Sequence, residues 1–155
     1  METSAGGGRE PLYLDDLRVG QRFTSGSHTM DEPDMVEFAG RFDPQPFHLD
    51  HEAARGTLFG GLAASGWHTA GITMRLQVTS GPPIAGGLIG AGGRIDWPRP
   101  TRAGDTLRVE SEVLEVRPSR SRPDRGIVTM LSNTLNQDDE VVQTFTVSMV
   151  VPRRP

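Results

Sequence analysis

An α+β fold, with an antiparallel sheet wrapped around a long helix, is predicted by three features of the sequence. Segments with a helical spacing of apolar residues lie in the first half of the 155 residues. Segments in which Val, Ile, Leu and Thr alternate with polar residues fill the second half, with short turns between them. The most apolar helical segment directly precedes these strands, so the economical packing places the sheet around it.

The first third of the chain is expected to form one strand and two helices. The strand is predicted over residues 22–30. Asp31 then has the character of a helix N-cap, with Pro33 in the first turn, so a helix should follow and stop near Arg41. A second, short helix is expected around residues 51–56.

The central helix is predicted over residues 65–78, after a glycine-rich turn. Trp67, Met74 and Val78 recur at helical spacing, and further apolar side chains lie on other faces. This pattern predicts a helix that is buried on most sides. Four antiparallel strands are expected after it, over residues 88–97, 105–117, 126–136 and 141–151.

Composition excludes several classes of protein. The formal charge of -4 argues against a general nucleic-acid binder, and the absence of cysteine excludes disulfides and zinc–thiolate sites. All 16 basic residues are arginine, which removes lysine Schiff-base chemistry. No apolar run approaches the ~20 residues that cross a bilayer, and the N-terminus lacks the layout of a signal peptide. We therefore expect a cytoplasmic protein without a membrane or nucleic-acid partner, with a flexible tail at residues 1–11 and a single domain at 12–155.

Asp43 and His48 are the candidate acid–base pair. Pro44 and Pro46 stand between them, and each proline fixes its own φ and pushes the preceding residue out of the helical region. The segment is therefore predicted to be a stiff, extended loop that holds a carboxylate and an imidazole in a set geometry, as gripping one water molecule requires. Taken alone, this spacing also fits an ordinary loop with a capping Asp and a partly buried His.

Three stretches of the chain together resemble a known family. Residues 38–48, 64–69 and 97–105 are similar to the MaoC-like dehydratases, relatives of the (R)-specific enoyl-CoA hydratases, which have the hot-dog fold. The first stretch resembles the hydratase motif D-x-N-P-x-H of that family, with Gln45 where many members have Asn. The likeness covers most of the chain, from about residue 19 to residue 151.

The resemblance implies a hydro-lyase that reversibly adds water to a 2-enoyl thioester, an enoyl-CoA in the simplest case, and forms a 3-hydroxyacyl thioester. In that family the Asp and His of the motif activate the water, and this role falls on Asp43 and His48. A backbone amide at the start of the central helix polarises the thioester carbonyl, and the aligned glycine is Gly66.

The same resemblance implies the substrate contacts and the partners. Gln45, Ser65, Trp67 and Met74 are the candidate substrate-binding residues, and Met74 falls where some members carry a small serine in the pocket. No cofactor is expected, and no metal, because two histidines three residues apart lack a third ligand at regular spacing. Members of the family pair to cover the open face of their sheet, so a homodimer or a higher homo-oligomer is expected.

Two alternatives from other classes stay open. A hot-dog acyl-thioesterase would use similar elements to aim water at the carbonyl carbon of the thioester. A non-catalytic acyl-CoA-binding subunit is compatible with Gln45 and Met74, where the sequence departs from the pattern of the hydratases.

Overall fold

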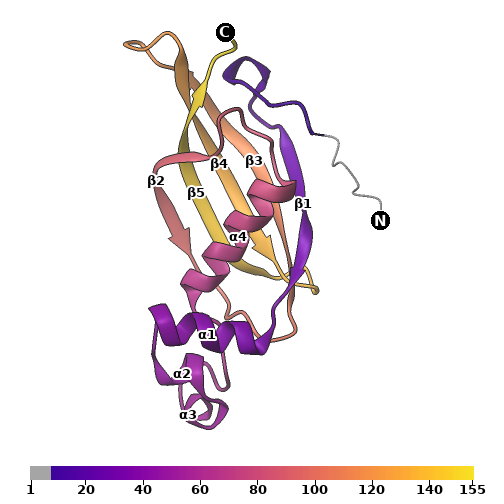
Figure 1. The fold of residues 1–155 in the computed structure, drawn as a ribbon, viewed down its shortest axis with the longest axis vertical. Helices are drawn as coiled ribbons and strands as arrows, with labels where there is room; N and C mark the ends of the chain where they lie inside the picture. Colours follow the sequence, from indigo (N-terminus) through magenta and orange to yellow (C-terminus); the bar gives the residue numbers. More distant parts are fainter. Residues whose placement is uncertain (1–7) are drawn as a thin grey trace, which may run out of the picture.

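A five-stranded antiparallel sheet carries the long helix α4 (Gly66–Ser80) on one face, which confirms the predicted fold class (Figure 1). The computed structural model describes residues 8–155. The strands lie in the order β1-β3-β4-β5-β2. Their bounds are β1 (Arg22–Thr29), β2 (Ile89–Asp96), β3 (Thr106–Pro118), β4 (Arg125–Leu135) and β5 (Val141–Pro152), each within one residue of the predicted range.

The three longest strands form the centre of the sheet because short turns join β3 to β4 and β4 to β5. The shorter β1 and β2 pair with β3 and β5 and form the two edges. Along β4, buried positions alternate with half-buried ones, which is the period of a strand with one covered face. The covered face is the one that lies against α4 (Figure 1).

The faces of α4 are not those that the sequence predicted. The side chains that face the sheet include polar residues such as Thr69, Thr73 and Gln77, whereas Trp67 and Met74 are 59% and 42% exposed. The prediction of a helix buried on most sides is therefore wrong for the single chain. Apolar spacing identifies a face that avoids water, but it does not identify the surface that covers that face.

Hydrogen bonds between side chains fill the space between α4 and the sheet. The hydroxyls of Thr73 and Thr134 lie 2.6 Å apart, and the side-chain amide of Gln143 donates from Nε2 to the Thr73 hydroxyl at 3.2 Å. One turn further along the helix, Gln77 Nε2 donates to the hydroxyl of Ser132 at 2.6 Å. These buried groups satisfy one another, which removes most of the cost of burying them.

Apolar side chains form two clusters at the two ends of the sheet. One cluster includes Leu14 of the 3-10 helix η1 (Leu14–Asp16) and packs against β3, β4 and β5. The other joins Met35 of α1 (Glu32–Phe42) to Leu62 and to residues of β3 and β5. The second cluster matters for function because it fixes α1 and the segment before α4 to the same end of the sheet.

The helical end of the molecule differs in one respect from the prediction. Asp31 caps α1 as expected, accepting the N–H of Asp34, and α3 (His51–Arg55) matches the predicted short helix. The predicted extended loop between Asp43 and His48 is wrong in its second half, because α2 (Pro46–Leu49) is one turn of helix. Gln45, the residue before Pro46, is extended, and Pro46 itself occupies the first helical position, where its fixed φ suits a helix.

Residues 1–7 of the predicted tail lie outside the described residues. From residue 8 on, the Arg9 side chain donates to the carbonyl of Gly81, and Leu12 forms an isolated bridge with Ile84. The division into a tail and a single domain stays a prediction. Within residues 8–155, none of the helices has the length and apolarity needed to cross a membrane.

Thr73→Val should destabilise the protein, because it leaves the side-chain N–H of Gln143 and the hydroxyl of Thr134 without the buried partner that Thr73 provides. The expected loss in the free energy of unfolding is about 1–3 kcal/mol, measured by urea denaturation. Thr79→Val is the matched control on the same helix, since Thr79 is exposed and bonds only to the carbonyl of Arg75. Equal effects of the two variants would contradict the role given to the buried polar layer.

Candidate active site

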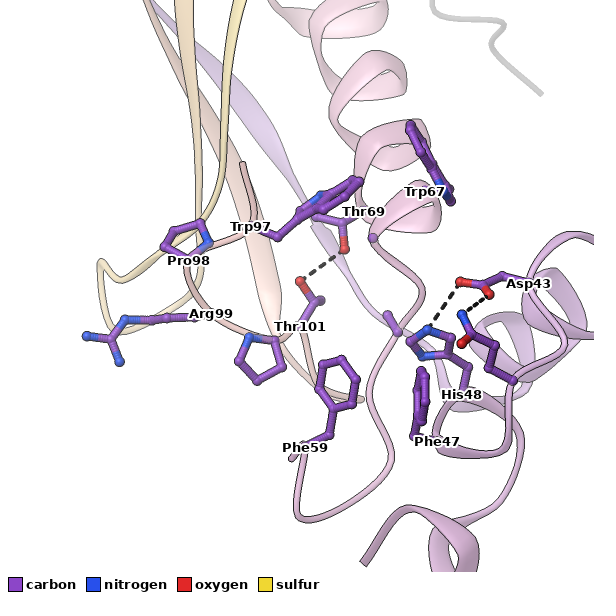
Figure 2. A pocket seen from close by; sticks show the side chains of 14 residues that line it. Asp43, Phe47, His48, Phe59, Trp67, Thr69, Trp97, Pro98, Arg99 and Thr101 are labelled. Carbon is purple, nitrogen blue, oxygen red and sulfur yellow. Dashed lines mark hydrogen bonds and ion pairs between the residues drawn. The ribbon is translucent and has the colours of Figure 1, made fainter. Parts of the chain in front are cut away.

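A pocket of about 490 Å³ lies where α4 begins, between the helical end of the molecule and the sheet (Figure 2). The side chains of Asp43 and His48 form one side, and Arg99 lies at the opposite side. Aromatic rings supply much of the wall between them. The aromatic lining residues are Phe47, Phe59, Trp67 and Trp97.

The structure brings the two predicted acid–base residues together. Asp43 is the C-cap of α1, and His48 lies on the single turn of α2. The connection between these helices is short, so the two side chains face one another. The Asp43 Oδ2 and His48 Nε2 atoms are 3.2 Å apart. His48 is only 4% exposed, whereas the edge of the carboxylate borders the pocket.

The protonated nitrogen of His48 is set by a backbone contact. Its Nδ1 lies 2.7 Å from the carbonyl oxygen of Ala63, and because a carbonyl only accepts, Nδ1 must carry a proton. Nε2 therefore points towards Asp43 as the nitrogen that can exchange a proton. A water molecule in the pocket, within hydrogen-bond distance of both Nε2 and Oδ2, could donate one O–H to each atom and keep its lone pairs for the substrate.

Two side chains stabilise the charge on Asp43. Gln45 Nε2 donates to Oδ1 at 2.6 Å, and the buried hydroxyl of Ser65 donates to Oδ2 at 2.8 Å. Burial raises the pKa of Asp43, but these two hydrogen bonds and the nearby His48 outweigh it, so the pKa lies below its usual value. The carboxylate is therefore ionised at neutral pH, as a proton acceptor must be.

Gly66 begins α4, directly after the N-cap Ser65. Within the described residues, its N–H has no backbone acceptor, as expected for the first turn of a helix. A side chain at this position would collide with Trp97, since a Cβ would lie 2.6 Å from the indole ring. The contact with Trp97 thus requires a glycine here, and Gly66 itself lines the pocket.

The pocket contains residues that the sequence did not indicate. Trp97 lines the pocket, and its indole N–H donates to Gln143 at 3.0 Å. Phe59 and Thr101 also line it, and Thr101 accepts a hydrogen bond from Thr69 at 3.0 Å. Trp97 and Thr101 lie in the stretch 97–105 that resembles the family, but the resemblance gave them no role, and Phe59 lies in a connecting segment without periodicity.

The predicted substrate-binding residues have different positions. Gln45 and Trp67 line the pocket, and Trp67 stands edge-on to Trp97 with ring centroids 5.2 Å apart. Ser65 lies behind Asp43 and bonds to it. Met74 is absent from the pocket lining and faces outward from α4, so its substrate contact stays a prediction. No group of residues suited to hold a metal ion occurs in the part of the chain that the structure describes.

A sheet that curves around one long helix, with a carboxylate–imidazole pair at the start of that helix, defines a hot-dog domain with an acid–base site. The model of the MaoC like domain matches residues 17–134. The chain therefore belongs to the MaoC-like family, in agreement with the resemblance of its motifs.

Known relatives support this assignment. The crystal structure of the MaoC-like dehydratase from Rhodospirillum rubrum is 64% identical, with a TM-score of 0.92, and the match covers 93% of this chain and 99% of that one. The R-hydratase PhaJ1 from Pseudomonas aeruginosa is 28% identical, with a TM-score of 0.73 and coverage of 93% and 88%. The 3-hydroxybutyryl-CoA dehydratase of Methylorubrum extorquens is 30% identical over 146 residues, which are 92% of this chain and 86% of the relative.

Gln45→Met should raise the pKa of Asp43, because it removes the amide donor and leaves the effect of burial less opposed. In the native protein the pKa is depressed, so the stability that the carboxylate contributes is present above the unfolded pKa of ~3.9 and is lost as the pH falls through the folded pKa. The Gln45→Met variant should lose this stability at a higher pH than the native protein does. Titration of the Asp43 carboxyl carbon by NMR measures the shift.

Gln21→Met is the control for this titration, since Gln21 bonds to the backbone around η1, away from Asp43. Gln21→Met should leave the pKa of Asp43 unchanged. If Gln45→Met also leaves this pKa unchanged, the amide of Gln45 does not stabilise the carboxylate.

Proposed function

We propose that this protein reversibly adds water to a 2-enoyl thioester, an enoyl-CoA, and forms the 3-hydroxyacyl thioester. The observation that carries this proposal is the 3.2 Å approach of Asp43 Oδ2 to His48 Nε2 at the start of α4. The pair lies in a pocket next to the free N–H of Gly66. A proton acceptor, a proton donor and an N–H that can meet an oxyanion are the three requirements of this reaction.

The geometry allows a defined sequence of proton transfers. A water held by the pair transfers one proton to it while the water oxygen bonds to the β-carbon. The π electrons of the double bond move towards the thioester oxygen, where the Gly66 N–H and the positive end of the α4 dipole stabilise the charge. The α-carbon then takes one proton from the Asp43–His48 pair. One water has then been added in total, and the pair is regenerated.

Similarity to known hydratases and dehydratases supports hydro-lyase chemistry. The related R-hydratase adds or removes water, and the related 3-hydroxybutyryl-CoA dehydratase takes its acyl group on coenzyme A. Coenzyme A is accordingly the carrier in this proposal. In it, Gln45 and Ser65 act on the substrate through Asp43, and Trp67 forms part of the wall around the thioester.

Asp43→Asn and His48→Gln should each lower turnover by about 10²–10⁴-fold, because each removes one member of the acid–base pair. Loss of the enoyl absorbance of crotonyl-CoA and of longer enoyl-CoA esters measures hydration. Circular dichroism shows whether the variants remain folded. Near-normal hydration by either folded variant would refute the assignment of the pair.

The same substrates separate hydration from the two alternatives. A thioesterase would release free thiol from saturated acyl-CoA esters. A binding subunit would bind crotonyl-CoA saturably and leave its absorbance unchanged. We expect neither result, because the side chains of Gln45 and Ser65 keep Asp43 ionised and the carbonyl of Ala63 orients His48, as activation of a water molecule requires.

The exposed apolar face of α4 supports a homodimer as the working form. Trp67, Met74 and Val78 lie on one side of the helix, with Gly71 between them, and are exposed to 59%, 42% and 60% in the single chain. Contiguous exposed apolar residues of this kind mark protein interfaces. Because Trp67 also lines the pocket, a second copy that covers this face would lie next to the site.

Met74→Arg should weaken self-association, because it places a charge in the middle of this apolar face. Sedimentation velocity should show a dimer for the native protein and a shift towards monomer for the variant. Leu114→Arg is the matched control, since Leu114 is also 42% exposed but lies on β3. A native protein that sediments as a monomer would contradict the dimer.

A further inference from the structure

The guanidinium of Arg102 forms an unusual set of contacts close to the pocket. It donates to three backbone carbonyls: those of Gly61 at 2.9 Å, of Leu62 at 3.1 Å and of Phe59. Within residues 8–155 it has no carboxylate within ion-pair distance. Its charge is therefore used to hold a piece of backbone.

The segment that Arg102 holds is the one that supplies the site. Residues 59–66 contain the Phe59 ring, the Ala63 carbonyl that orients His48, the Ser65 hydroxyl that donates to Asp43, and the N–H of Gly66. Residues 57–65 form neither helix nor strand, so no regular hydrogen-bond ladder fixes their path. Contacts from neighbouring segments must therefore fix it.

The other fixing contacts come from the two sides of the pocket. The N–H of Ala63 donates to the carbonyl of Phe47 at 3.1 Å, and the N–H of Ala64 donates to the carbonyl of Thr101 at 2.9 Å. Thr101 precedes Arg102, whose own N–H donates to the buried carboxylate of Asp105 at 2.8 Å. One rigid corner of the chain, at residues 101–105, thus holds the segment by both backbone and side chain.

We propose that Arg102 is a positioning residue for the acid–base pair. The inference rests on the proposed function and deepens it. Arg102 does not line the pocket, so its effect on the reaction passes through the segment 59–66 to Ala63, Ser65 and Gly66. A shift of this segment misplaces the acceptor for His48 and the donor for Asp43 at the same time, and a catalytic group misplaced by ~1 Å can cost 10²-fold in rate.

The chemistry of arginine fits this role. Three carbonyls within one turn of the chain, at residues 59, 61 and 62, need several donors in a fixed plane, which a guanidinium supplies and an ammonium does not. The segment also includes Gly60 with φ +64, a conformation that favours glycine. The turn that brings these carbonyls together therefore has its own sequence requirement, and Arg102 fits the turn that results.

Arg102→Met should lower kcat by about 10²-fold for the enoyl thioester that the native enzyme hydrates. It should also move the acid limb of kcat to higher pH, because loss of the Ser65 hydrogen bond leaves the effect of burial on the pKa of Asp43 less opposed. Arg102→Lys should recover only part of kcat. Guanidinium ion, added to Arg102→Ala well below denaturing concentrations, should raise its turnover. If Arg102 had a purely structural role, Arg102→Met would lower the folded fraction, and the acid limb of the remaining activity would stay at the same pH as in the native enzyme. This result would overturn the proposal.

Arg108→Met is the matched control. Arg108 is also a partly buried arginine with several acceptors, including Asp139 at 2.6 Å, but it lies on β3 away from residues 59–66. It should leave kcat and the acid limb unchanged. A fall in kcat equal to that of Arg102→Met would show a general effect of arginine loss and would also overturn the proposal.

A second readout keeps this test separate from the proposed function. In ¹⁵N-histidine NMR, the Nδ1–H of His48 should be protected from solvent exchange in the native protein and should lose this protection in Arg102→Met. Absence of hydration by the native protein, with this change present, would refute the proposed function and leave the positioning contact supported. Active native protein with an Nδ1–H that is equally protected in Arg102→Met would refute the positioning role alone.

Discussion

The hydroxyl of Ser65 joins the two parts of the molecule on which the site depends. It accepts the N–H of Trp67 and so caps α4, and it donates to the carboxylate of Asp43 at the end of α1. One fully buried atom thus ties the start of the central helix to the acid–base pair. If the helix began one residue earlier or later, both the carboxylate and the free N–H of Gly66 would lose their common position. The geometry of the pocket follows from this junction.

Hydrogen-bond donors hold the Asp43 carboxylate, and a hydrogen-bond acceptor holds the His48 ring. Asp43 accepts from Gln45 and Ser65, which keeps the carboxylate charged despite its burial. His48 donates to the Ala63 carbonyl, which directs its other nitrogen to the carboxylate. Because both partners are fixed before any substrate binds, little reorganisation is needed when charge develops, and this is the condition under which fixed dipoles are most effective.

The placement of polar and apolar residues on α4 has a consequence for assembly. The helix buries hydroxyl and amide groups against the sheet, where Thr134, Ser132 and Gln143 satisfy them. Its larger apolar side chains, including Trp67 and Met74, face outward. A helix that contributes polar groups to the core and apolar groups to the surface is best explained by a second surface that covers it. The homodimer proposed above provides that surface, and it would also enclose the side of the pocket that Trp67 borders.

The sequence by itself determined the α+β class, each strand to within one residue, the Asp31 cap and the pairing of Asp43 with His48. These features depend on local periodicity, on proline and on capping, and all of these act over a few residues. The sequence could not predict which side of α4 meets the sheet, because that depends on what the strands offer in return. It also assigned no role to Trp97, Phe59 or Arg102. Their roles arise where connecting segments that are distant in sequence meet, and only tertiary packing brings those segments together.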